Sequence, residues 1–514
     1  MASGHIQRNY GNFRQSAAIH DLDPDVNGNI LLVYNRQSVA AQWTSGQTWN
    51  REHVWPQSRQ PGSASNSSKG NLGDPHALRP CNPGVNSSRS NKPFGLVTSN
   101  GSFGSKGSYY FPGDADRGDI ARSLFYSSVR YGLALVEGFP SGNSMGDLNA
   151  LVAWHYLDTP DTFERRRNHT IFSSQFNPSY FTNNRNAFVD LPGTVWSVFV
   201  GEPNDSTLYV GSDPAADGSS VLAADLGVFI AGSGASSDEV TLRRFGADGV
   251  YYAVHAEGDI ATNQPLLGGF TGAFPIGVGK PQSIEFSLAE GAGVTPGVIA
   301  GVLTIENLDV TTGLGSGFGG LDGDDVVEVT GIALAPSSLS FSSGGASVST
   351  TLDLGSVQIG ETGDIDLPLW AFDGVPGFTA GGVAAAGESS GDLDEVSVVL
   401  PVGVIEPGSS SSIAVSVTPA AKGEIEAVFQ ITTADDPSID GAAPRGLLTL
   451  TVTAEGVGPV CVADVNSDGL LDGSDFNAWL GAFVNGDSAA DSNLDGLLDA
   501  SDFSAWLGSF LAGC

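Results

Sequence analysis

The amino-acid chain changes character near residue 193, and this break limits its fold more than any single motif. Residues 1–192 contain 17 Lys and Arg against 14 Asp and Glu, whereas the remainder holds 5 basic and 43 acidic side chains. Six of the seven histidines also lie in the first part. Because 514 residues are too many for one hydrophobic core, several domains are expected. Only the first, mildly basic part can approach a polyanion without electrostatic repulsion.

The first part combines helical and irregular segments, and we expect an α+β domain over residues 1–195. Apolar residues recur at helical spacing in residues 119–131, and residues 148–156 show a similar pattern. Residues 163–168 predict a charged helical turn. No stretch of about 18 uninterrupted apolar residues occurs, so no membrane span is expected. The first eight residues also lack the apolar core of a signal peptide.

Beyond residue 200, Gly, Ser, Thr, Val and Asp dominate, and short runs alternate between apolar and polar residues. Runs at 301–306, 413–417 and 448–452, bounded by Gly, Pro and Asp, are typical of antiparallel sandwich strands. We therefore expect two β-sandwich domains, at 200–332 and 335–456. The second resembles the immunoglobulin-like spacer domains of bacterial surface proteins. A spacer role is favoured for both, with a carbohydrate-binding module as the alternative.

The last segment, residues 460–514, contains an internal repeat with a period of 27 residues. In each copy, oxygen-bearing side chains occupy positions 1, 3, 5, 9 and 12 of a loop that has glycine at position 6. This spacing can fold oxygens around one calcium ion, because the glycine permits a sharp turn. The expected Ca²⁺ ligands are Asp464, Asn466, Asp468, Asp472 and Asp475 in the first loop, and Asp491, Asn493, Asp495, Asp499 and Asp502 in the second.

Each loop precedes a short amphipathic helix, and we expect the two helices to bury their apolar faces against each other. The loops and helices together resemble a type I-like dockerin, which implies a small α-helical tail with a cohesin-like or cell-surface partner. Calcium is expected to drive folding, because the converging carboxylates repel one another without the ion. Cys461 and Cys514 bracket the segment, and a disulfide or two unpaired thiols are both open. The apolar face of the first helix comprises Phe476, Trp479, Leu480 and Phe483, and that of the second helix comprises Phe503, Trp506, Leu507 and Phe510.

Residues 49–56 read WNREHVWP and place a histidine and a carboxylate between tryptophans. His53 can take a proton from water near neutral pH, and Glu52 offers a hard oxygen to a divalent cation such as Mg²⁺. Asn86 supplies a neutral oxygen, and Arg89, on the same predicted helix face, can contact a phosphate. This set suits metal-assisted hydrolysis of a phosphodiester. Because neighbours on a strand point to opposite faces, Glu52 and His53 can serve one site only at a strand end, turn or bulge.

The order of these motifs resembles the secreted bacterial endonuclease I family. The resemblance implies a ββα-metal (His-Me finger) head in which His53 is the general base and Glu52 and Asn86 ligate a divalent metal. It also implies a secreted or cell-surface enzyme that cuts DNA, with RNA as a second candidate, at little sequence preference. The matching motifs are REHVWP at 51–56, HALRP at 76–80, VNSSRSN at 85–91, RGDIAR at 117–122, WH at 154–155, FERRRN at 163–168 and NRNAFVD at 184–190.

Other charged residues of this part have two readings each. Arg79, Arg89 and Arg122 are the candidate substrate-binding residues, although solvated or salt-bridged roles are favoured for Arg79 and Arg122. His76 is expected to be mainly structural. The arginines at 165–167 either follow a DNA backbone or form an exposed helix face.

The predicted protein is thus a modular metal-dependent endonuclease with two β-sandwich spacers and a calcium-binding tail. An adhesion or matrix protein, whose head binds nucleic acid without cutting it, is the alternative from another class. A ribonuclease with poor activity on DNA is a third hypothesis. Loss of DNA degradation on replacing His53 separates the enzyme from the adhesion protein.

Overall fold

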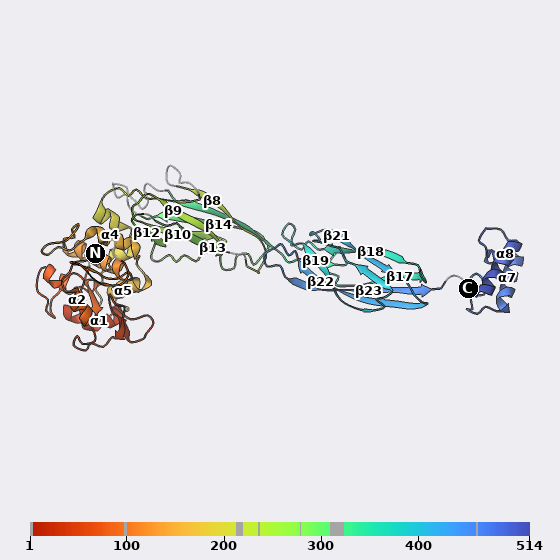
Figure 1. The fold of residues 1–514 in the computed structure, drawn as a ribbon, viewed down its shortest axis with the longest axis horizontal. Helices are drawn as coiled ribbons and strands as arrows, with labels where there is room; N and C mark the ends of the chain where they lie inside the picture. The colour runs from red at the N-terminus through yellow and green to blue at the C-terminus, as the bar shows by residue number, and fades with distance from the viewer. Residues whose placement is uncertain are drawn as a thin grey trace. The chain divides into compact units, whose positions relative to one another are not determined.

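The computed structural model describes residues 4–96, 100–211, 219–234, 237–277, 279–308, 323–458 and 461–513 (Figure 1). The chain divides into two compact units. The first comprises residues 1–226, 236–292 and 299–331, and the second comprises residues 227–235, 293–298 and 332–514. The expected multidomain architecture, rich in β-sheet with a few helices, is confirmed.

The first 200 residues, called the head below, consist of helices and short strand pairs. At its centre β3 (Asn50–His53) pairs antiparallel with β4 (Leu78–Cys81), and α2 (Pro83–Arg89) follows directly. The Asn82 side chain accepts the N–H groups of two residues in the first turn of α2, which fixes where this helix begins. The other elements are η1 (Tyr10–Asn12), α1 (Phe13–His20), β1 (Asn29–Leu31), β2 (Ser38–Ala40), η2 (Gln57–Arg59), η3 (Gly70–Leu72), η4 (Pro75–Ala77), β5 (Gly104–Lys106), β6 (Tyr109–Phe111), α3 (Arg117–Tyr131), α4 (Leu148–Leu157), α5 (Thr162–Phe172), α6 (Ala187–Asp190) and the π-helical turn η5 (Trp196–Val200).

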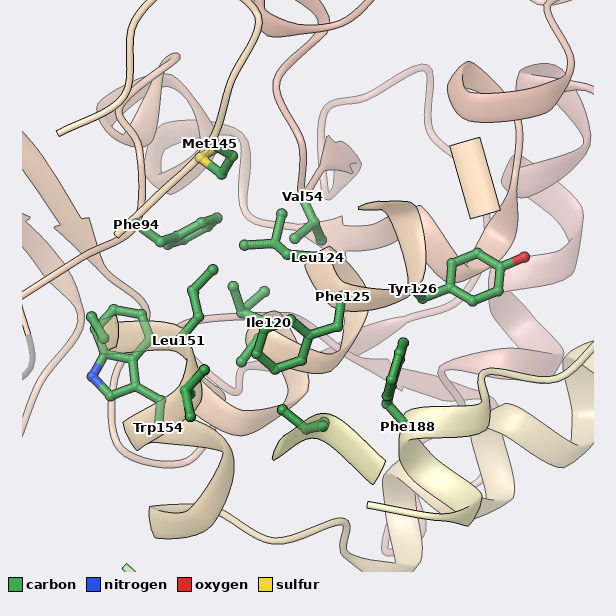
Figure 2. Packing of buried hydrophobic residues seen from close by; sticks show 14 of the residues in the cluster. Val54, Phe94, Ile120, Leu124, Phe125, Tyr126, Met145, Leu151, Trp154 and Phe188 are labelled. Carbon is green, nitrogen blue, oxygen red and sulfur yellow. The ribbon is translucent and has the colours of Figure 1, made fainter. Parts of the chain in front are cut away.

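A hydrophobic core surrounds α3 and α4 (Figure 2). Ile120 and Leu124 on α3 and Trp154 on α4 are fully buried in it. The helical spacing read from residues 119–131 and 148–156 therefore predicted both helices correctly. Val54, which directly follows β3, belongs to the same cluster. The core thus supports the chain segment that leaves the β3–β4 pair.

Two sheets follow the head, with strand orders β12-β10-β14-β15-β8 and β11-β13-β9-β7. Tyr251 on β10 and Phe270 belong to the hydrophobic cluster of the head. The Tyr251 hydroxyl donates to the carbonyl of His155 at 2.7 Å. The head and these sheets therefore share one core, and functional tests call for the full chain. The strands are β7 (Thr207–Val210), β8 (Val221–Ile230), β9 (Asp238–Phe245), β10 (Val250–Gly258), β11 (Ile260–Thr262), β12 (Gly272–Phe274), β13 (Gln282–Leu288), β14 (Gly297–Asn307) and β15 (Asp325–Leu334).

The second unit contains two four-stranded sheets, with strand orders β16-β18-β21-β20 and β17-β23-β22-β19. Its own hydrophobic cluster includes Leu369, Ile413 and Leu450. The pairing is antiparallel except between β17 and β23, which run parallel. The strands are β16 (Leu339–Ser340), β17 (Ser349–Gln358), β18 (Gly363–Ala371), β19 (Gly382–Gly391), β20 (Val396–Val399), β21 (Ser410–Val417), β22 (Gly423–Asp435) and β23 (Pro444–Val457).

The tail contains α7 (Gly473–Asn485), η6 (Ser488–Ala490) and α8 (Ala500–Ala512). The rings of Trp479 and Trp506 lie 5.9 Å apart and are both buried. Each indole N–H donates at 3.1 Å to a carbonyl of the other repeat, Trp479 to Ala490 and Trp506 to Ala463. The expected contact between the helix faces is confirmed for these aromatic residues.

The leucines predicted to join these tail faces behave differently. Leu480 and Leu507 are 42% and 36% exposed. Phe476 and Phe503 are 37% and 38% exposed as well, so the fully buried contact is narrower than the faces expected from the sequence and is centred on the two tryptophans.

Cys81 is a free, buried thiol, and Cys461 is disulfide-bonded. Cys514, its expected partner, lies outside the described residues. None of the helices in the described part of the chain combines the length and the apolar character that crossing a bilayer requires.

Candidate active site

The end of β3 places the two predicted catalytic residues beside each other. Glu52 pairs with Arg79 and His53 pairs with Leu78 in the register of the β3–β4 hairpin. His53 is the last residue of β3, so the alternation of the strand stops there. Glu52 and His53 both line one groove. The condition set by the sequence, that two neighbours can serve one site at a strand end, is met.

The imidazole of His53 is fixed by three neighbours. Its Nε2 lies 3.0 Å from the carbonyl oxygen of Leu72. Because a carbonyl only accepts, Nε2 carries the proton and Nδ1 is left as a hydrogen-bond acceptor. Nε2 of Gln57 donates to that Nδ1 at 3.2 Å, and the ring of Tyr10 lies 4.7 Å away. The tautomer needed for a base facing the groove is therefore set by the fold.

Burial determines the charge state of this histidine. Loss of hydration lowers the pKa of His53 to about 4; the bond to Leu72 opposes the shift, and the charges of Arg51 and Arg89 add to it. His53 is thus neutral near pH 7 and able to accept a proton.

Glu52 is held by a phenol and a guanidinium. The Tyr34 hydroxyl donates to Glu52 Oε1 at 2.7 Å, and Nη1 of Arg89 lies 3.1 Å from the same oxygen. Burial raises the pKa of Glu52, while Arg89 and the Tyr34 hydrogen bond act in the opposite direction. Tyr34 was not singled out from the sequence, because only the fold brings it to residue 52.

Arg89 is more deeply engaged than the sequence suggested. Its guanidinium donates to the carbonyls of His53 and Val54 at 3.1 and 2.7 Å, and it lies 4.6 Å from the ring centre of Phe94. Only 1% of the residue is exposed. These contacts favour positioning of Glu52 and the end of β3 over the predicted direct contact with a phosphate.

Asn86 faces the same groove from α2. Its Nδ2 donates to Oδ1 of Asn50 at 2.8 Å, which orients the amide, and no described residue donates to its Oδ1. The groove, about 410 Å³ in volume, thus brings His53, Glu52 and Asn86 together. Its full lining comprises Arg51, Glu52, His53, Pro56, Gln57, Ser58, Asn86, Arg89, Ser90 and Asn91.

These donors fit a divalent metal of the Mg²⁺ type. One carboxylate and one amide oxygen, with water and substrate phosphate completing the shell, match how Mg²⁺ is commonly bound. Among the described residues no three His, Cys, Asp or Glu side chains gather closely enough to hold a metal ion. A metal in this groove would therefore depend on the amide of Asn86 as well as on Glu52.

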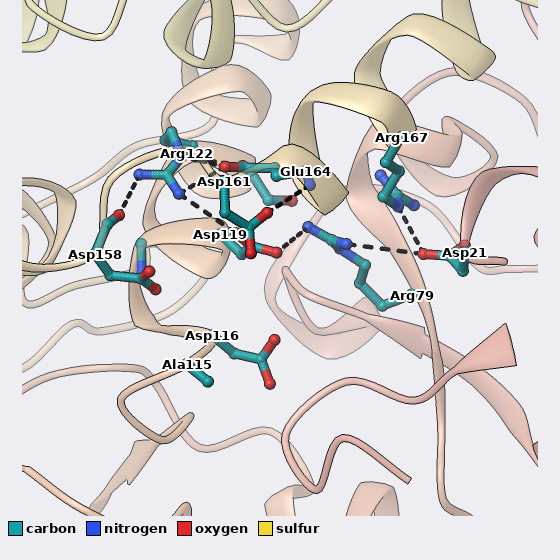
Figure 3. Close-up of polar contacts among 12 residues, drawn as sticks. Asp21, Arg79, Ala115, Asp116, Asp119, Arg122, Asp158, Asp161, Glu164 and Arg167 are labelled. Atoms are coloured by element: carbon teal, nitrogen blue, oxygen red, sulfur yellow. Dashed lines mark hydrogen bonds and ion pairs between the residues drawn. The ribbon is translucent and has the colours of Figure 1, made fainter. Parts of the chain in front are cut away.

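The prediction that Arg79 and Arg122 bind substrate is wrong in this structure, because both are buried in ion pairs (Figure 3). Arg79 Nη2 lies 3.0 Å from Asp119 Oδ2. Arg122 Nη2 lies 2.6 Å from Glu164 and 3.3 Å from Asp119. Neither arginine lines the groove. The favoured salt-bridged reading of both residues is confirmed.

The remaining candidates are structural as well. His76 Nε2 donates to the Asn184 carbonyl at 3.0 Å, and the residue is buried outside the groove. Arg167 is buried against Asp21 at 2.7 Å, and Arg165 lies over the ring of Phe270 at 4.6 Å. The reading of an exposed helix face is therefore wrong for Arg167, whereas Arg165 and Arg166 are partly exposed and a DNA track along them stays a prediction.

The two tail loops share the same backbone hydrogen bonds, although no three of their described acidic side chains gather closely enough to hold a metal ion. In the first, Asp464 accepts the N–H groups of Asp468 at 3.1 Å and Gly469 at 2.9 Å, and Gly469 has φ 77°. Asp475, at position 12, is fully buried, and its Oδ1 lacks any hydrogen-bond partner in the described structure. Asp491 repeats the Asp464 bonds in the second loop. An orphaned, buried carboxylate oxygen suits a cation.

Comparison with known proteins assigns the head. Residues 5–193 match the family described as Endonuclease I. Extracellular ribonucleases from Bacillus amyloliquefaciens and Bacillus subtilis (strain 168) are 35% and 34% identical to the chain over 219 and 212 residues. The alignments cover 37% of this chain and 68% and 69% of the relatives. The chain belongs to the endonuclease I family.

The groove of His53 thus lies within the endonuclease I domain. A solved structure of a protein of unknown function from Porphyromonas gingivalis W83 aligns with 49% of this chain and 97% of its own. Its identity is 18% and its TM-score is 0.16, which is too low to indicate a shared fold.

Proposed function

We propose that the chain is a secreted, metal-dependent endonuclease that hydrolyses phosphodiester bonds of DNA and RNA. One observation carries the proposal: His53, Glu52 and Asn86 line a single groove in an endonuclease I domain. The extracellular location of both Bacillus ribonucleases supports secretion. The β3–β4–α2 order supports a ββα-metal site of the His-Me finger type.

His53 acts as the general base in this proposal. Its Nδ1 takes a proton from water, and the Leu72 carbonyl stabilises the imidazolium that forms through the Nε2–H bond. The water oxygen bonds to phosphorus as the bond from phosphorus to the 3′ oxygen breaks, which leaves a 5′-phosphate. Glu52 and Asn86 would hold the divalent cation, whose charge would stabilise the phosphate and the leaving 3′ oxygen, and that oxygen becomes a hydroxyl by taking a proton from solvent water. Arg89 keeps Glu52 aimed at the groove.

Side-by-side assays of the full chain on DNA and RNA test this function. We expect degradation of nucleic acid in Mg²⁺ and none in EDTA, because the groove supplies too little positive charge without the cation. The ratio of the two rates decides between a general nuclease and a ribonuclease with poor activity on DNA. Binding of both substrates without cleavage in Mg²⁺ would instead favour the adhesion protein.

Replacing Asn86 by alanine is expected to weaken the binding of the metal ion and to leave the function of His53 as a base intact. The Mg²⁺ concentration that gives half the maximal rate should rise by about 10- to 100-fold, as for the loss of a group that supports a metal site. The rate at saturating Mg²⁺ should recover most of the wild-type value. Ser88→Ala, an exposed change on the same helix, is the control. An unchanged Mg²⁺ requirement in Asn86→Ala would exclude this residue as a ligand.

For the tail, the proposal is a dockerin-like pair of Ca²⁺ loops that attaches the enzyme to a cohesin-like or cell-surface partner. The supporting observations are the two equivalent loops and the orphaned oxygen of Asp475. The sandwich of the second unit is a spacer in this proposal, and its own hydrophobic cluster supports this role.

A further inference from the structure

One of the two cations that line the groove has no described carboxylate as a partner. Two guanidinium groups line the groove, those of Arg51 and Arg89. Arg89 is committed to Glu52. Arg51 forms no ion pair with any carboxylate in the described part of the chain. Of the two arginines that line the groove, Arg51 is therefore the one whose charge no described carboxylate offsets.

The Arg51 side chain is held in place without being neutralised. Its Nη1 donates to the carbonyl of Tyr10 at 2.9 Å and to Oδ1 of Asn66 at 3.3 Å. Its guanidinium carbon lies 3.6 Å from the ring centre of Tyr10 and 5.5 Å from that of Trp43. A guanidinium fixed by stacking and hydrogen bonds loses little entropy when it binds an anion.

The remaining donors of Arg51 are available. Nε and Nη2 form no hydrogen bond with described residues, and neither is among the buried polar atoms that lack a partner. Both nitrogens therefore retain access to solvent. A guanidinium with two free donors matches the oxygens of a phosphate group.

Arg51 also has a fixed relation to the base. Arg51 and His53 both contact the ring of Tyr10, and two residues of strand separate them by about 7 Å. In the proposed function, Glu52 and Asn86 mark the position of the phosphate that is cut. A phosphate held by Arg51 would then be a neighbouring one of the same backbone.

We propose that Arg51, clamped by Tyr10, binds the backbone phosphate next to the scissile one. This inference rests on the proposed nuclease function. It makes Arg51 a substrate-binding residue and Tyr10 a positioning residue that couples this arginine to His53. The sequence placed Arg51 in the REHVWP motif but gave it no role, because its lack of a carboxylate partner is visible only in the fold.

The test measures binding separately from cleavage. A short fluorescein-labelled single-stranded DNA is titrated with the full chain in EDTA at several salt concentrations. Arg51→Gln should bind about tenfold more weakly, which corresponds to one charge-assisted contact. The dependence of log affinity on log salt should become shallower by about 0.7, the value for one phosphate contact on a single strand. Arg51→Lys should keep the wild-type salt slope while losing affinity, because lysine retains the positive charge but lacks the planar pair of N–H donors of the guanidinium.

The matched control is Arg185→Gln, which removes a partly exposed arginine that pairs with Asp190 outside the groove. Equal affinities and salt slopes for Arg51→Gln and Arg185→Gln would overturn the inference. If Arg51→Gln does not fold, judged by thermal unfolding, Arg51→Lys decides by affinity alone, and an affinity equal to that of Arg185→Gln would overturn the inference. Cleavage assays of the wild type in Mg²⁺ distinguish failure of the nuclease proposal from failure of the Arg51 proposal. If the wild type cleaves but Arg51→Gln binds as tightly as the control, only the role of Arg51 is rejected. A wild type that neither binds nor cleaves rejects the proposed function with it.

Discussion

His53→Ala is expected to lower the rate of nucleic acid hydrolysis by about 10²- to 10⁴-fold, the usual contribution of a general base. The imidazole is the base that the fold prepares, with Nε2–H bound to the Leu72 carbonyl and Nδ1 left as an acceptor. Alanine leaves no group on that side chain to take the proton from water. The measurement is kcat/KM on one DNA substrate at saturating Mg²⁺.

His169→Ala is the matched control for this loss. His169 is exposed on α5, and it contacts Arg185 rather than the groove. Its replacement should leave the rate within about twofold of wild type, as for most surface changes. Comparable rates for His53→Ala and His169→Ala would show that the assignment of the base is wrong.

The pH dependence of the same rate provides a second reading of His53. The neutral imidazole is the active form, so the rate should rise with pH through the pKa of His53 and then level off. Burial lowers this pKa to about 4, so the acid limb should lie well below the ordinary histidine value. A metal cation beside Glu52 would lower the pKa further, in the same direction. An acid limb near about 6.5 would contradict a buried base.

Removal of calcium is expected to unfold the tail while leaving the head folded. Each loop carries four aspartates and one asparagine as its expected ligands, and without a cation nothing offsets the repulsion among the carboxylates when the loop closes. Amide hydrogen exchange is the measurement, because it resolves the tail from the rest of the chain. Protection of residues 461–513 should be lost in EGTA and return with Ca²⁺, whereas protection of α3 and α4 should persist.

Single substitutions test which loop carboxylates bind the calcium ions. Asp475→Asn and Asp502→Asn replace the two fully buried carboxylates at loop position 12, so each should raise the Ca²⁺ concentration needed for protection. Asp487→Asn is the control, since Asp487 is exposed and caps η6 outside both loops. Equal protection of the tail in EGTA and in Ca²⁺ would reject calcium-driven folding.

Local patterns were enough to predict much of the fold and the groove. The motif at 51–56 and the repeat in the tail encode short-range geometry. Asn86 and Arg89 are three residues apart in the sequence, so a helix brings them to one face. The end of β3 at His53 then resolved the one geometric difficulty that the sequence posed.

The partners of charged residues could not be predicted in the same way. Arg79 and Arg122 meet Asp119 and Glu164 only after segments 40 or more residues apart have folded together. The Leu72 carbonyl that sets the tautomer of His53 has no sequence signal, because any residue carries a carbonyl. The shared core between Tyr251 and the head was missed for the same reason: alternation shows which residues are buried but not what they contact.

The central claim is that one groove joins an imidazole base to a metal held by Glu52 and Asn86. The most direct measurement is hydrolysis of a single DNA substrate by the full-length wild type and by His53→Ala, each in Mg²⁺ and in EDTA. We expect rapid product formation only by the wild type in Mg²⁺. Equal product from His53→Ala in Mg²⁺, or from the wild type in EDTA, would contradict it.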